Sequence, residues 1–142
     1  MKYIDARINL DIRFSEVDSM GIVWHGNYLK YMEDAREFLG KELGMNYLEV
    51  YNQGYFVPIV RVNLDYKAPI QLGDHVGVQI ILEYSKAAKI IHHYNIWNRT
   101  TDVLACAAYS EQVFINRDTR ELELYKPEMY ASWCDQLDWK TK

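Results

Sequence analysis

The chain has 142 residues, a formal net charge of −4, and 49% hydrophobic and 25% charged residues. This composition is typical of a folded domain, and it excludes a largely disordered chain or a strongly basic nucleic-acid surface. The longest apolar run, Val103 to Tyr109, is much shorter than the ~20 residues that span a bilayer. The N-terminus lacks the apolar segment of a signal peptide. Two cysteines, Cys106 and Cys134, make a poor disulfide framework, so we expect one domain over 1–142 in the reducing cytoplasm.

Changes in hydrophobic period predict the secondary structure in chain order. Alternating apolar residues predict a strand over 4–14, which is followed by a loop that contains Asp18. Apolar residues that recur every three and four positions then predict a helix over 27–43, with Asn27 as its N-cap and Gly44 just beyond its end. The remaining expected elements are a short helix over 46–51, strands over 56–66, 74–84, 88–97 and 103–115, a turn at 116–119, a helix over 127–137, and a disordered tail after about 138.

This order of elements favours an α+β architecture with one antiparallel five-stranded sheet wrapped around one long helix. No long helix connects the later strands, which disfavours a parallel sheet. One helix covers only part of such a sheet, so a partner subunit is expected to cover the remaining apolar surface and an edge. We therefore expect a homodimer or a homotetramer.

The loop before the long helix holds a candidate catalytic group. Asp18 is followed by His25 seven residues later and by Tyr28 three residues beyond. The first backbone N–H groups of a helix have no partner within it, and they can stabilise a developing oxyanion. A nearby carboxylate can act as a nucleophile or as a general base. The alternative is structural: Asp18 shapes a turn and His25 packs against Trp24.

Two motifs in this chain resemble those of a known enzyme family. The first is Asp18-x-x-Gly21-x-Val23-x-His25-x-Asn27-Tyr28, directly after a strand that ends in Arg13-Phe14. The second is Tyr66-x-x-Pro69-x-x-x-Gly73-Asp74. Together they resemble the 4-hydroxybenzoyl-CoA thioesterase family of hotdog-fold acyl-CoA thioesterases. The resemblance implies the hotdog fold and hydrolysis of an acyl-CoA or acyl-carrier thioester, with coenzyme A as part of the substrate and no metal or redox cofactor.

The resemblance also implies roles for particular residues. The catalytic carboxylate falls on Asp18, and the amide that polarises the thioester carbonyl falls on His25. Tyr28 is similar to a tyrosine that lines the acyl pocket or orients the carboxylate, and this pocket is expected at a subunit interface. The expected substrate contacts are Trp24 and Gly26 near the helix start, with Lys86 and Lys89 near the coenzyme A phosphates.

Two other functions remain open from the sequence. One is a non-catalytic thioester-binding or dimerisation module, and the other is a hotdog dehydratase that acts on 3-hydroxyacyl thioesters. His92 and His93 are adjacent in a predicted strand and therefore point to opposite faces, which argues against a shared metal. The charged helix face formed by Glu33, Asp34 and Glu37 is interpreted as solvent-exposed, although a helix lying across a pocket would present Glu33 or Asp34 to a ligand.

Overall fold

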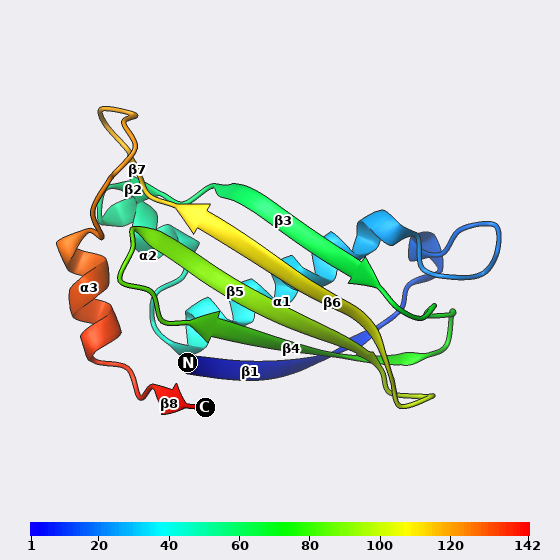
Figure 1. Ribbon diagram of the computed structural model, residues 1–142. Coiled ribbons are helices and arrows are strands. Elements are labelled where there is room, and N and C mark those ends of the chain that lie inside the picture. The colour runs from blue at the N-terminus through cyan, green and yellow to red at the C-terminus, as the bar shows by residue number, and fades with distance from the viewer.

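The structure, a computed structural model, describes residues 1–142 and contains a curved antiparallel sheet that wraps around the long helix α1 (Tyr28–Glu42) (Figure 1). The sheet has six strands in the order β3-β6-β5-β4-β1-β8. Their bounds are β1 Lys2–Asp11, β3 Ile59–Tyr66, β4 His75–Glu83, β5 Lys89–Asn98, β6 Val103–Val113 and β8 Lys140–Thr141. The smaller elements are α2 (Tyr47–Asn52), α3 (Glu128–Asp135), the two-stranded pair β2 (Tyr55–Phe56) and β7 (Ile115–Asn116), and the 3-10 turns η1 (Phe14–Glu16) and η2 (His25–Asn27).

The core lies between the concave face of the sheet and α1. Alternate residues of β4, from Val76 to Leu82, are buried, and so are the residues of α1 that recur at helical spacing. Ala35 is fully buried in the middle of α1, where its small side chain allows close packing against the sheet. Truncating a fully buried residue such as Ile80 to Ala would cost about 2–5 kcal/mol of stability.

The ends of α1 agree only in part with the sequence prediction. Gly44 has φ = +76° just after the helix, as predicted for the residue that ends it. Asn27 is the N-cap residue, as predicted, but its side chain does not cap the helix: its Nδ2 donates to the carbonyl oxygen of Glu16 at 2.8 Å. The buried amide of Asn27 therefore anchors the preceding loop to the start of the helix.

Three other predicted boundaries also require correction. The strand predicted over 56–66 is divided into β2 and β3, because Pro58 lies between them and cannot donate to a ladder. The first strand ends at Asp11 because Arg13 is the N-cap residue of η1, where its N–H donates to the Glu16 carboxylate at 2.8 Å. The tail is not disordered at residues 140–141: β8 pairs with β1 and makes the sheet six-stranded instead of five-stranded.

Strand β3 forms an exposed edge of the sheet. It pairs with β6 on one side only, and nearly all of its residues are exposed, including Val60 at 57% and Val62 at 40%. An exposed apolar strand edge is a template for pairing with another chain. No helix of the structure is long and apolar enough to cross a membrane.

Candidate active site

Asp18 lies at the tip of a small hairpin between β1 and α1. The hairpin is held by the N–H of Asp18, which donates to the Ile22 carbonyl at 2.8 Å, and by an isolated bridge between Val17 and Val23. Oδ1 of Asp18 accepts the N–H of Met20 at 2.8 Å, which is the side-chain bond of an Asx turn. Asp18 therefore shapes the turn, as the structural alternative to a catalytic role predicts. Its second oxygen, Oδ2, has no hydrogen bond within the chain and is available to a ligand or water.

The 3-10 turn η2 presents two unused backbone amides at the start of α1. Trp24 precedes it in an extended conformation, and the N–H of Asn27 donates back to the Trp24 carbonyl at 2.9 Å. The N–H groups of His25 and Gly26 donate to no group of the chain. Two free amides at a helix start form the kind of donor pair that stabilises an oxyanion.

Aromatic side chains surround these amides. The Tyr66 hydroxyl donates to the carbonyl oxygen of His25 at 2.7 Å, and the ring of Tyr66 lies 5.1 Å from that of Tyr28, centroid to centroid. Tyr28 is buried, and burial raises the pKa of its hydroxyl to about 12. Its hydroxyl therefore stays protonated at neutral pH, so Tyr28 can donate a hydrogen bond but does not act as a general base.

Only glycine fits at position 26, because the Trp24 side chain occupies the space that a Cβ would need. A Cβ at position 26 would overlap the six-membered part of the Trp24 indole. The indole therefore lies directly over the backbone of Gly26, while about half of the Trp24 side chain remains exposed. The predicted pair of contact residues thus forms one surface beside the free amides.

The two predicted phosphate-binding lysines lie at the other end of β4. The hairpin adjoins the start of β4, because the N–H of Val23 donates to Ile70 at 2.8 Å, whereas both lysines follow the end of this strand. Lys86 is exposed in the β4–β5 turn, and Nζ of Lys89 is paired with Glu111 at 2.8 Å. A single chain therefore does not bring the lysines to Asp18.

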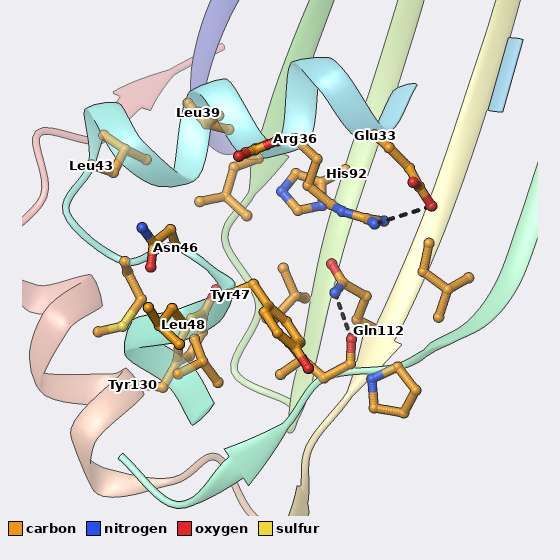
Figure 2. A pocket seen from close by; sticks show the side chains of 18 of the residues that line it. Glu33, Arg36, Leu39, Leu43, Asn46, Tyr47, Leu48, His92, Gln112 and Tyr130 are labelled. Atoms are coloured by element: carbon orange, nitrogen blue, oxygen red, sulfur yellow. Dashed lines mark hydrogen bonds and ion pairs between the residues drawn. The ribbon is translucent and has the colours of Figure 1, made fainter. Parts of the chain in front are cut away.

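The large cavity of the chain also lies away from Asp18. It has a volume of about 780 Å³ and is enclosed by the second half of α1, by α2 and α3, and by the concave face of the sheet (Figure 2). Its walls are mainly apolar, and its polar lining residues include Glu33, Glu37, Arg36, His92 and Gln112. Asp18 and the predicted contact residues near the helix start do not line it.

The sequence analysis did not identify this cavity, although two signals pointed toward it. Glu33, considered there as a ligand contact, does line the cavity, whereas Asp34 does not. Alternation along β5 predicts that His92 faces inward, and it is 5% exposed, while His93 faces outward and lies 3.2 Å from Glu83. The cavity itself combines residues from positions 33 to 133, and no local pattern encodes such a set.

The sheet wrapped around one long helix is the architecture of a hotdog protein. The sequence model of the family described as "Thioesterase-like superfamily" matches residues 12–133 of this chain. The Bacillus subtilis protein YneP, whose name assigns it to the acyl-CoA thioesterases, is 33% identical over 136 residues, which are 96% of this chain and 93% of YneP. The chain belongs to the thioesterase-like superfamily.

Two further relatives agree with this assignment. The acyl-CoA thioesterase YbgC of Helicobacter pylori is 31% identical over 116 residues, covering 76% of this chain and 84% of YbgC. The crystal structure of the DHNA-CoA thioesterase from Staphylococcus aureus superposes with a TM-score of 0.76 at 28% identity, covering 94% of this chain and 89% of that one. The predicted hotdog fold and the predicted class of enzyme, a thioester hydrolase, are confirmed.

Proposed function

We propose that this protein hydrolyses acyl-CoA thioesters at sites shared between two copies of the chain. The observation that carries the proposal is the separation within one chain of Asp18 and the free amides from the large cavity. Each half lacks what the other supplies. The amides do not line the large cavity, and the cavity lining includes neither Asp18 nor the free amides.

The exposed edge of β3 supports a shared site, because two copies of this edge can pair with each other. The end of β3 is tied to the free amides, because Tyr66 bonds to His25, and the start of β3 lines the cavity through Ile59. In an antiparallel pair related by a twofold axis, the end of one strand lies beside the start of the other. The hairpin of one copy then lies near three parts of the second copy: its cavity, its β4–β5 turn and its Lys86.

The proposed reaction uses groups of this chain together with water. The N–H groups of His25 and Gly26 hold the thioester oxygen as negative charge develops on it. Asp18 either attacks the carbonyl carbon, forming an anhydride that water then hydrolyses, or removes a proton from an attacking water. The C–S bond breaks and the coenzyme A thiolate leaves, taking up a proton. Trp24 and Gly26 form the surface beside the thioester, and Tyr28, whose ring contacts that of Tyr66, lines the site. No metal or redox cofactor takes part.

The proposal also assigns a binding residue to the coenzyme A phosphates and a cellular compartment to the protein. We assign the coenzyme A phosphates to Lys86 in preference to Lys89, because the ammonium of Lys89 is already paired with Glu111. An acyl-carrier thioester would present the same reacting group. Cys106 and Cys134 are free and buried, which fits our assignment of the protein to the cytoplasm.

The experiment that tests this proposal measures thiol release from short, long and aromatic acyl-CoA substrates. Asp18→Asn should lower kcat by about 10²–10⁴-fold. Asparagine keeps an oxygen that accepts the Met20 N–H, so the turn is retained and only the charge is lost. Wild-type turnover in this variant would contradict the role of Asp18. Thermal stabilisation by acyl-CoA without turnover would indicate a binding module, and loss of water from a 3-hydroxyacyl-CoA would indicate a dehydratase.

A further inference from the structure

Three hydrogen bonds form a closed circuit around the turn that carries the two free amides. The carbonyl oxygen of Glu16 accepts two of them, from the N–H of Trp24 at 2.9 Å and from Nδ2 of Asn27 at 2.8 Å. The third is donated by the N–H of Asn27 to the carbonyl oxygen of Trp24 at 2.9 Å. His25 and Gly26, whose N–H groups are free, are the two residues between Trp24 and Asn27. The circuit therefore holds this turn at both of its ends.

Glu16 also connects the turn to the candidate catalytic carboxylate. Asp18 follows it by two residues, and Val17 between them is extended, with φ = −97° and ψ = 149°. The Glu16 carboxylate in turn accepts the N–H of Arg13 at 2.8 Å and the hydroxyl of Tyr31 at 3.1 Å. Burial raises the pKa of the Tyr31 hydroxyl, which therefore remains a donor at neutral pH. Glu16 is thus a fixed point between the carboxylate and the free amides.

Asn27 supplies the side-chain member of the circuit. The other two hydrogen bonds join backbone groups, whereas the bond from Nδ2 of Asn27 reaches back 11 residues to Glu16. Asn27 is 5% exposed and does not line the large cavity. It therefore acts on the turn through the carbonyl group of Glu16 and not through contact with a ligand.

We infer that Asn27 is a positioning residue that fixes the Asp18 carboxylate relative to the free amides of His25 and Gly26, an inference that rests on the proposed function. In the proposed reaction, the carboxylate acts at the thioester carbon while the amides hold the thioester oxygen. A misplacement of about 1 Å in such an arrangement can cost about 100-fold in rate. Without the bond from Asn27, Glu16 holds the turn only through Trp24, on the side before the free amides.

The first test is Asn27→Leu, which removes the donor and keeps a side chain of similar size. Its kcat should fall by roughly 10- to 100-fold, while KM stays within about threefold because the substituted side chain does not contact the substrate. The matched control is Tyr94→Phe, which removes a buried hydrogen bond of 2.8 Å to Ser110. The control should lower Tm and leave kcat unchanged. A folded Asn27→Leu protein with the wild-type kcat would overturn the proposal.

A second variant, Asn27→Asp, gives a pH signature that a general loss of stability does not produce. The ionised carboxylate repels the carbonyl oxygen of Glu16, whereas the protonated carboxyl donates to it as the amide does. Burial and this hydrogen bond favour the neutral form and raise the pKa of the introduced carboxyl. The ratio of its kcat to the wild-type kcat, both measured at the same pH, should therefore rise as pH falls. A ratio that does not change with pH would overturn the proposal.

Amide relaxation in NMR tests the positioning without turnover. If the wild-type protein hydrolyses no acyl-CoA, the proposed function fails separately, and the heteronuclear NOE of the backbone amides still reports how firmly the turn is held. In Asn27→Leu, the NOE of His25, Gly26 and the hairpin around Asp18 should fall, and in Tyr94→Phe it should not. Unchanged values in Asn27→Leu would overturn the role of Asn27.

Discussion

The hydroxyl of Tyr66 donates to the carbonyl oxygen of His25 at 2.7 Å and thereby joins the exposed edge strand to the start of α1. The two residues are 41 positions apart in the sequence. The bond holds the peptide that follows His25, whose N–H belongs to Gly26. The position of one oxyanion donor therefore depends on an interaction made by the strand that we assign to the dimer interface.

We predict that Tyr66→Phe lowers kcat without unfolding the protein. One hydrogen bond is worth about 1 kcal/mol, so the expected loss in kcat is about three- to tenfold if the bond positions the amide. Steady-state kinetics with thermal melting as the fold control measures this. An unchanged kcat would separate Tyr66 from the reaction, and the matched variant Tyr109→Phe, on β6, should leave kcat unchanged.

A second prediction concerns the free edge of β3. Val62→Lys adds a charge to an exposed strand that pairs with β6 on one side only. It should convert the proposed dimer to a monomer in light scattering and reduce turnover together with it. Leu124→Lys changes a side chain that is 76% exposed outside this strand, and it should preserve the dimer. A Val62→Lys protein that remains dimeric and active would contradict the assigned interface.

A third prediction follows from the Lys89–Glu111 ion pair. The hydrogen bond from Lys89 lowers the pKa of Glu111, so the carboxylate binds its proton less readily in the folded chain than in the unfolded chain. The pair therefore stabilises the fold above the unfolded pKa, and this contribution is lost as pH falls through the lower, folded pKa. Lys89→Met should lower Tm by about 1–4 °C at neutral pH.

Melting curves across pH check the sign of this effect. The difference in Tm between Lys89→Met and the wild-type protein should shrink as the solution is acidified and vanish once Glu111 is protonated in both the folded and the unfolded chain. A difference that stays constant with pH would mean that the stabilisation by Lys89 does not depend on the charge of Glu111.

Local patterns in the sequence predicted most of the elements because each depends on neighbouring residues. The helix predicted over 46–51 is present as α2, where the side chain of Asn46 accepts the N–H of Glu49 at 2.9 Å. Strand β8 was missed because two residues carry no alternation, and it is held instead by pairing with β1 and by an ion pair between Lys140 and Asp5.

The loop that contains Asp18 could be predicted from the sequence, whereas the cavity could not. Asp18 and the helix-start amides lie within one short segment, so spacing alone placed them together. The cavity joins Arg36, His92 and Tyr130 from three distant elements, and only the tertiary structure shows their common wall. In the proposed shared site, the relation between loop and cavity depends further on a second copy of the chain.

The most direct test of the shared site is the activity of a hybrid dimer. Asp18→Asn removes the carboxylate, and Val57→Trp places a bulky side chain in the wall of the cavity, which Val57 lines. Each variant alone should be inactive. Co-expression with two different tags isolates dimers that contain one chain of each kind. The account predicts about half of the wild-type activity per hybrid dimer, because one site combines the intact Asp18 of one chain with the intact cavity of the other. Hybrid dimers as inactive as the two parents would contradict it, since they would place the whole site within one chain.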